Sequence, residues 1–230
     1  MVTRTRTETD TPKRIKMTYK EYLKLAPDSQ KVEWVKGEGI VYMPPLTRHQ
    51  EISLFLSQLL GLFVDFFRMG RIMIAPLEVK LWPGGPSREP DLFFISTNNL
   101  YNLTEKRYEG GPDLVIELLS TGSLKIDRVD KFSEYEKAGV LEYWLIDPRP
   151  FQQQADFYVM TPDGLHSAEV DKKGRYHSTV LPGFWLDLSW LWQEELPNPQ
   201  LAFAEIMLTQ ENLPAETKET FDALKNLLST

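Results

Sequence analysis

The sequence predicts a mixed α/β (α+β) domain, because short apolar runs typical of buried strands alternate with helix-forming segments along most of the chain. Two runs, Asp91–Ile95 and Asp113–Leu119, carry apolar residues at consecutive positions, as strands do when both faces of their sheet are covered. A third such run is Leu141–Ile146. The region after residue 155 has turn signals between β-forming stretches and predicts an antiparallel β extension.

Three helices are expected before this extension. The first should run over 18–26, where Thr18–Glu21 forms a capping-box pattern. A second capping-box pattern, Thr47–Gln50, opens a helix to about Arg68 that is apolar nearly all round and should be buried in the core. The third helix should run over 127–138 and end at the following glycine.

The remaining segments predict strands and turns. Trp34–Met43 is expected to form a turn followed by a strand, and Arg71–Trp82 is rich in β-formers but interrupted at Pro76. Pro83–Pro86 is a turn. The antiparallel extension is predicted from three strand-like stretches near residues 156–160, 165–170 and 175–181.

The composition limits the kind of protein that this chain can be. Its 230 residues are enough for one domain with its own core, and the absence of cysteine excludes disulfides, thiolate zinc sites, iron–sulfur clusters and cysteine nucleophiles. The 33 acidic and 26 basic residues give a net charge of −7, which does not suit a nucleic-acid coat protein. A local basic groove is still compatible with that charge.

The ends of the chain differ in character from its middle. Residues 1–16 are polar, lack the apolar core of a signal peptide and predict a disordered arm, so the expected location is the cytoplasm. The longest uncharged apolar run, 52–64, has 13 residues and is shorter than the roughly 20 needed to cross a bilayer, so no membrane partner is expected. We assign 17–192 to the folded domain and 193–230 to a helical C-terminal tail.

Two carboxylates lie where burial makes a charge costly. Asp91 opens one apolar run, and Glu117 lies inside another. Two acids at the ends of neighbouring strands would form an oxygen-rich site suited to Mg²⁺ or Mn²⁺, which can activate water and neutralise charge on a phosphate. The alternatives are a buried salt bridge from Glu117 to a residue such as Lys131 and a strand-start role for Asp91.

The helix that follows carries Asp127, Lys131 and Tyr135 at four-residue spacing, so all three share one face. Lys131 could hold water or a phosphate oxygen. Alternatively, Asp127 caps the helix and Lys131 pairs with it on a solvated surface. Glu33 and His49 are weaker candidates, since they also suit a helix end and a first helical turn.

A series of motifs follows in a recognisable order from about Met17 to Trp192. It comprises E-x-x-x-G-E at Glu33–Glu38, the helix-opening His49, Glu89-Pro90-Asp91, Gly111–Ser120, Asp127…Lys131…Tyr135, Ala138-Gly139-Val140 and Glu142–Pro148. This set resembles the Uma-two family of endonucleases, which belongs to the restriction-endonuclease-like, PD-(D/E)XK superfamily. The resemblance implies a mixed central sheet flanked by helices.

The resemblance also implies roles for individual residues. Asp91 and Glu117 would bind the metal, with the main-chain carbonyl of Leu118 as a further ligand. The superfamily's usual lysine would be at position 119, which is Leu119 here, so Lys131 from the next helix would replace it as a catalytic residue. The auxiliary residues implied are Glu33 (from the first helix), His49, Ser120, Asp127 and Tyr135.

The function expected from these residues is Mg²⁺- or Mn²⁺-dependent hydrolysis of DNA phosphodiester bonds, with Lys131 orienting or helping to deprotonate water. Arg88, Lys125 and Arg128 are expected to contact the nucleic-acid backbone. A homodimer is expected, because two symmetric sites suit cleavage of both strands of a duplex. The alternative is a catalytically inactive nuclease fold that binds nucleic acid or protein, which Leu119 and the acidic net charge favour.

Overall fold

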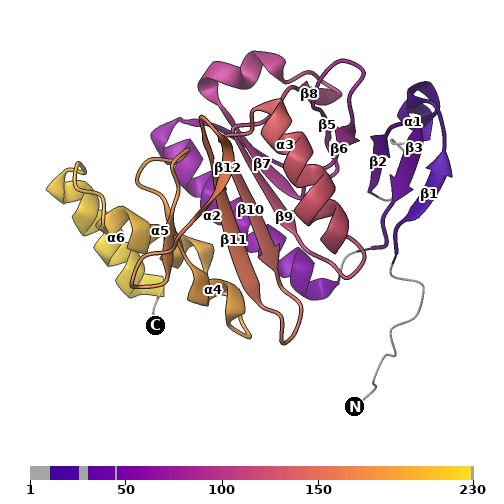
Figure 1. Cartoon of the computed structure of the whole chain (residues 1–230). Coiled ribbons are helices and arrows are strands. Elements are labelled where there is room, and N and C mark those ends of the chain that lie inside the picture. Colours follow the sequence, from indigo (N-terminus) through magenta and orange to yellow (C-terminus); the bar gives the residue numbers. More distant parts are fainter. Residues whose placement is uncertain (1–10, 26–30, 45, 229–230) are drawn as a thin grey trace.

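The computed structural model describes residues 11–25, 31–44 and 46–228. Its elements alternate between helices and short strands (Figure 1). In chain order they are β1 (Lys13–Lys16), α1 (Tyr19–Leu25), β2 (Val32–Val35), β3 (Glu38–Val41), α2 (Thr47–Phe67), β4 (Gly70–Ile74), β5 (Glu78–Lys80), β6 (Ser87–Arg88), β7 (Leu92–Ser96), η3 (Thr97–Asn102), β8 (Arg107–Glu109), β9 (Leu114–Leu118), η4 (Ile126–Lys131), α3 (Phe132–Ala138), β10 (Glu142–Asp147), β11 (Gln154–Thr161), β12 (Gly164–Ala168), β13 (Arg175–His177), β14 (Trp185–Asp187), α4 (Leu188–Trp192), α5 (Pro199–Leu208) and α6 (Ala215–Leu228).

A mixed six-stranded sheet in the order β12-β11-β10-β9-β7-β4 forms the centre of the molecule. Only the β9–β10 pair in this sheet is parallel, and the connection between these two strands carries η4 and α3. Every other neighbouring pair is antiparallel. The predicted mixed α/β class is therefore confirmed.

The two faces of the central sheet are covered by different helices (Figure 1). On one face, Leu114, Ile116 and Trp144 pack with side chains of α2. On the other face, Val115 and Tyr143 pack with side chains that include Tyr135 of α3. Alternate residues of one strand thus enter opposite cores, which confirms that the predicted apolar runs are strands buried on both sides.

Helix α2 is the core helix expected from the sequence, but its start differs from the prediction. Leu46 is the N-cap and provides no side-chain hydrogen bond, so the prediction of a capping box at Thr47–Gln50 is wrong. The helix ends where Arg68 adopts a left-handed conformation. By length and composition alone α2 could cross a membrane, a property that it shares with core helices of soluble proteins. Its buried side chains lie in the main core.

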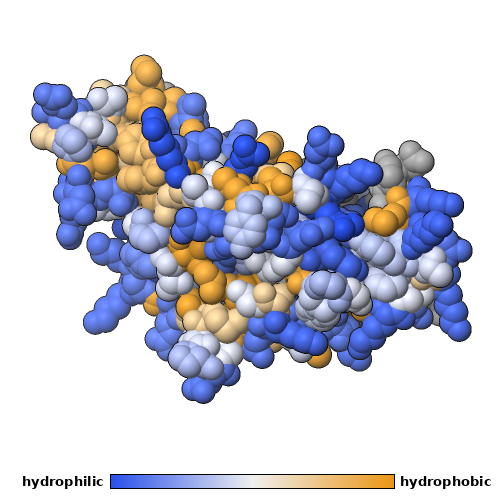
Figure 2. All heavy atoms as spheres, turned by 90° about the horizontal axis from the view of Figure 1, so that it is seen from above, coloured by the Kyte–Doolittle hydropathy of each residue, from blue (hydrophilic) through white to orange (hydrophobic). Residues whose placement is uncertain are grey.

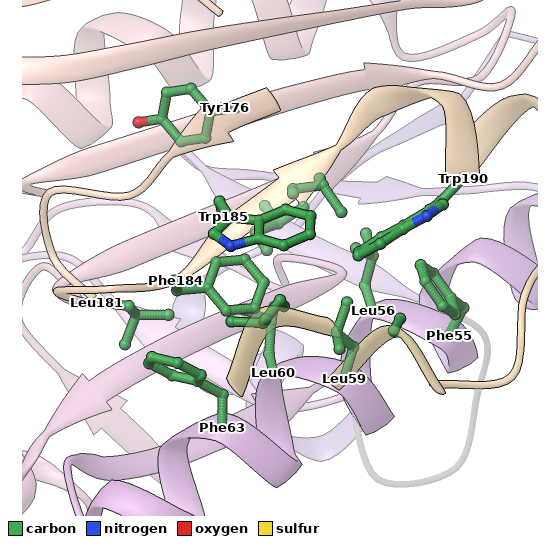
Figure 3. Close-up of a cluster of buried hydrophobic side chains, with 14 of the residues drawn as sticks. Phe55, Leu56, Leu59, Leu60, Phe63, Tyr176, Leu181, Phe184, Trp185 and Trp190 are labelled. Carbon is green, nitrogen blue, oxygen red and sulfur yellow. The ribbon is translucent and has the colours of Figure 1, made fainter. Parts of the chain in front are cut away.

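The C-terminal segment completes this core. Figure 3 shows Phe184, Trp185 and Trp190 packed against side chains of α2. Beyond them, two helices form as expected, and α5 packs on α2 and α6. Figure 2 shows a largely hydrophilic surface with apolar side chains gathered toward the end of the molecule that carries α5 and α6. These aromatic side chains are part of the buried core.

A second sheet, in the order β1-β3-β2-β6-β5-β8, lies beside the central one (Figure 1). Its first strand, Lys13–Lys16, pairs with β3, so the predicted disordered arm extends too far; residues 1–10 lie outside the described residues. The capping box before α1 is confirmed. Glu21 accepts a hydrogen bond from the Thr18 backbone nitrogen at 2.7 Å, and Thr18 Oγ1 accepts one from the Glu21 nitrogen at 3.3 Å.

The antiparallel extension is part of the central sheet rather than an appendage. β11 pairs along its length with β10, and β12 pairs with β11. The third predicted strand is short and pairs with β14 in a separate two-stranded sheet. Strand β14 is not evident from the sequence.

The loop between β10 and β11 contains an exposed residue in an unfavourable backbone conformation. Phe151 is fully exposed with φ of 64°, and it follows Pro150 in a turn closed by the Gln152 nitrogen and Arg149 oxygen at 3.0 Å. Turns with proline at this position favour glycine or asparagine at the next. We expect Phe151→Asn to raise the free energy of unfolding by about 1 kcal/mol, or Tm by about 2–4 °C, because asparagine tolerates this region better.

Differential scanning calorimetry measures this effect. Phe151→Ala is the matched control, since it removes the exposed ring but keeps a side chain that disfavours positive φ. It should leave Tm nearly unchanged. An unchanged or lower Tm for Phe151→Asn would contradict the strain assigned to this turn.

Candidate active site

Asp91 and Glu117 meet where two neighbouring strands of the central sheet adjoin. Asp91 directly precedes β7, Glu117 lies in β9, and these strands pair antiparallel with Leu92 opposite Ile116. The backbone nitrogen of Leu118 donates to Asp91 Oδ2 at 2.8 Å. Both side chains are buried, so the structure brings together the two acids that the sequence singled out.

Two cationic or polar side chains contact these carboxylates from other elements. Lys31, just before β2, places Nζ 2.9 Å from Asp91 Oδ1 and 3.6 Å from Glu117 Oε2. His49, in the first turn of α2 as predicted, places Nε2 3.3 Å from Asp91 Oδ2. Sequence reasoning missed Lys31. Lys31 lies two residues before Glu33, and in an extended segment such residues face the same side. This spacing was the sequence signal that could have placed Lys31 at the site.

Lys131 reaches the site from the helix after β9, as the resemblance implied. Its Nζ lies 2.8 Å from Glu117 Oε1, 2.9 Å from Glu33 Oε1 and 3.0 Å from Asp127 Oδ1. Tyr135 also donates its hydroxyl to Glu117 Oε1 at 2.8 Å. The expected shared face of Asp127, Lys131 and Tyr135 is therefore present. It is buried, which excludes the alternative of an ion pair on a solvated surface.

The segment that carries Lys131 is wound as a π-helix, Ile126–Lys131, before α3 begins. Such segments are uncommon and occur frequently at functional sites. Asp127 lies within this segment rather than at its N-cap, so the predicted capping role is wrong. Ser120 lies at the exposed rim, where its hydroxyl contacts Ser123 Oγ at 3.0 Å.

Glu33 lies on strand β2 rather than on a helix, which corrects the expected origin of this acid. Its side chain is completely buried and fully engaged. Oε2 accepts hydrogen bonds from the Tyr42 hydroxyl at 2.6 Å and Arg88 Nη1 at 2.8 Å, while Oε1 faces Lys131. Glu33 therefore fixes the positions of cationic side chains behind the site and has no oxygen left for a metal.

The three basic residues that were expected to contact nucleic acid differ in their exposure to solvent. Arg88 is 1% exposed and bonded to Glu33 and Glu134, so the prediction that it contacts nucleic acid is wrong. Arg128 is partly exposed and pairs with Asp156 at 2.8 Å. Lys125 is exposed. Proximity in sequence to the acidic motifs did not indicate which basic side chains face solvent.

The surroundings separate the protonation behaviour of the two acids. Burial would raise the pKa of Asp91, but Lys31 and His49 overcome that effect and hold it well below its usual range. Burial also raises the pKa of Glu117, and here Lys131 and Lys31 offset the effect only in part. Asp91 is therefore the constantly charged member of the pair, and Glu117 retains a proton more readily.

Lys131 keeps its proton. Burial alone would lower its pKa, but Asp127, Glu117 and Glu33 together raise it well above the ordinary lysine value. In this state Lys131 is an ammonium donor, and its contacts suit positioning of Glu117. The expectation that Lys131 helps to deprotonate water stays a prediction.

The paired acids lie at a large cavity of about 1400 Å³. Besides Asp91 and Glu117, its walls include His49, Lys31 and Lys131. Other parts of the wall come from the loops after β9 and β10 and from the first turns of α2. An extended substrate could therefore approach both carboxylates from solvent.

The donor set fits a hard divalent cation. Within the described residues, no three histidine, aspartate or glutamate side chains are placed to hold a metal by themselves. Mg²⁺, however, often takes only one or two carboxylates and completes its shell with water and phosphate oxygens. The ammonium of Lys31 already contacts both carboxylates, which shows that the space between them accepts a cation.

Comparison with known proteins identifies the family. A family model described as "Putative restriction endonuclease" matches residues 19–189. The chain belongs to the Uma2 family. This confirms the resemblance found in the sequence, and by that description the family is one of nucleases.

Two individual proteins are similar to this Uma2 chain. An uncharacterized protein of Synechocystis sp., sll1609, is 27% identical over 133 residues, which cover 57% of this chain and 75% of that protein. The crystal structure described as a putative nuclease belonging to DUF820 from Anabaena variabilis is 20% identical, with a TM-score of 0.60 over 76% of this chain and 97% of that one. At 20% identity, the similarity to the Anabaena variabilis structure shows a shared fold.

Two positions of the Uma2 motifs have structural roles here. Leu119 is buried in the core beneath α3. The position at which the superfamily usually has a lysine is therefore occupied here by a core residue. Glu142 is also buried and accepts hydrogen bonds from Trp144 Nε1 at 2.6 Å and from the Thr179 nitrogen and hydroxyl at 2.8 Å each. It fastens the segment after β13 to the central sheet.

Proposed function

We propose that this Uma2 protein is an endonuclease that hydrolyses DNA phosphodiester bonds with Mg²⁺ or Mn²⁺. The observation that carries the proposal is the position of Asp91 and Glu117. They meet at adjoining strands, share one ammonium group and line an open cavity. The family description supports nuclease activity, and the structural neighbour is described as a "putative nuclease".

In this proposal Asp91 and Glu117 hold the metal, with the Leu118 carbonyl as a further ligand. A divalent ion bound there would supply an activated water and neutralise charge on the phosphate. His49 holds Asp91 through Nε2, and Tyr135 and Lys131 both contact Glu117 Oε1. These residues fix both carboxylates before the substrate arrives, which is the positioning on which such catalysis depends.

One observation favours a second candidate function, an inactive nuclease fold that binds nucleic acid or protein. The charges of the site are already paired internally, because Lys31 and Lys131 contact the carboxylates. Two arginines of the cavity wall are also engaged: Arg48 with the Leu191 carbonyl at 3.0 Å and Arg149 with Asp147 at 2.6 Å. Such a protein would bind a strand without cutting it.

Incubation of the purified protein with supercoiled plasmid and with labelled single- and double-stranded oligonucleotides separates the two functions. The proposal expects cleavage with Mg²⁺ or Mn²⁺, loss of cleavage with a chelator and recovery when metal is restored. Oligonucleotide binding by anisotropy without cleavage under any of these metal conditions would favour the inactive binding module instead.

A further inference from the structure

Lys31 occupies a particular position among the charged groups of the site. Its ammonium lies against both acids of the pair, 2.9 Å from Asp91 Oδ1 and 3.6 Å from Glu117 Oε2. It also faces the ring of Tyr42, with Nζ 5.6 Å from the ring centroid. A single positive charge thus lies between the two carboxylates that would hold a metal.

The other lysine of the site has a different environment. Lys131 is 1% exposed and is surrounded by three carboxylates behind the acid pair. The Lys31 side chain is 23% exposed and lines the cavity. Lys31 can therefore leave the carboxylates by turning toward solvent, whereas Lys131 cannot move without abandoning three partners.

Two carboxylates brought together repel each other unless a cation lies between them. On the proposed function, a divalent ion would compete with the Lys31 ammonium for the carboxylates of Asp91 and Glu117. We propose that Lys31 is a resident counter-cation that holds the acid pair in the metal-free protein and is displaced when the metal binds. The affinity for the metal then depends on the competition between the metal and the Lys31 ammonium for the two carboxylates.

Isothermal titration of the full-length protein with MnCl₂ tests the competition. Lys31→Met should bind Mn²⁺ at least tenfold more tightly than the wild type, because no ammonium has to be displaced. Arg149→Met is the matched control. It also removes a positive charge from the cavity wall, but Arg149 is paired with Asp147 and its change should alter the affinity less than twofold. Equal affinity in Lys31→Met and wild type would overturn the proposal.

A direct view of the displacement comes from the side-chain ¹⁵Nζ resonances of lysine-labelled protein. The Lys31 signal is assigned by its absence in Lys31→Met. It should shift or broaden on titration with Mg²⁺ in the wild type, and the same titration of Asp91→Asn should leave it in place. A Lys31 signal that is unmoved at saturating Mg²⁺ would show that the ammonium and the metal occupy separate places.

These measurements involve no nucleic acid, so they are independent of cleavage. Displacement of Lys31 without cleavage of any DNA would uphold this proposal and refute the nuclease assignment. Mg²⁺-dependent cleavage with Lys31 unmoved would do the reverse. If neither the wild type nor Lys31→Met binds Mn²⁺, the proposal that Lys31 competes with the metal is overturned. The nuclease activity is then decided by the cleavage assay alone.

Discussion

Lys131→Met is expected to lower the free energy of unfolding by about 3–5 kcal/mol, because it removes one partner from a buried ion-pair network. The variant would leave three buried carboxylates, Glu33, Glu117 and Asp127, without the ammonium that now lies within 3.0 Å of each. Methionine fills a similar volume, so the loss reports charge rather than a cavity. Urea unfolding monitored by circular dichroism measures it.

The effect of Lys131→Met should depend on pH. In the wild type, burial raises the pKa of Glu117 to about 7, and Lys131 is the largest of the charges that offset burial. Without Lys131 the folded-state pKa of Glu117 rises further. A carboxyl whose pKa is higher in the folded than in the unfolded protein loses its contribution to stability as the pH rises through that folded-state value, so the deficit should be larger at pH 8 than at pH 5.

The exposed Lys125 provides the control for this variant. Lys125→Met changes the same residue type on the same helix and should alter stability by less than about 0.5 kcal/mol. A deficit below about 1 kcal/mol for Lys131→Met, or one that is independent of pH, would be inconsistent with the network described here.

Asp91→Asn is expected to abolish metal-dependent cleavage, with a loss of roughly a thousandfold or more, and to weaken Mn²⁺ binding at least tenfold. The substitution keeps the shape of the side chain and an oxygen that can accept the Leu118 backbone hydrogen bond, so the fold should persist. It removes the negative charge that faces Lys31 and His49. Single-turnover cleavage and calorimetric titration measure the two losses.

Glu89 supplies a matched control for Asp91→Asn. It is also a buried acid, only two residues away, but its carboxylate accepts a hydrogen bond from the Val32 nitrogen at 3.3 Å and does not line the cavity. Glu89→Gln should retain both metal binding and cleavage. Retained cleavage in Asp91→Asn would remove this residue from the proposed site.

The sequence anticipated those parts of the site that local periodicity determines. Spacing alone placed Lys131 and Tyr135 on one face, and a charge within an apolar run correctly indicated that Glu117 needs a cation. The salt-bridge interpretation of Glu117 is confirmed, since Lys131 is bonded to it. The metal-site interpretation stays a prediction. Helix α2 was likewise evident from its continuous apolar surface.

Features decided by tertiary contacts were not accessible in this way. Glu33 was assigned to a helix, but it lies on a strand of a second sheet whose pairing involves residues far along the chain. Arg88 looked available to a ligand, and only the fold shows that Glu33 and Glu134 bury it. Lys31 carries no motif of its own; its role arises because the second sheet brings it to the central one.

The site spans the junction between these two sheets. Lys31 directly precedes β2 and Glu33 lies in it, whereas Asp91 directly precedes β7 and Glu117 lies in β9 of the central sheet. Strand β6 leads directly into the segment that carries Asp91. A partly folded chain with an intact central sheet would therefore present unmatched acids rather than a working centre. On the proposed function, cleavage of nucleic acid would then depend on the packing of the second sheet against the central one.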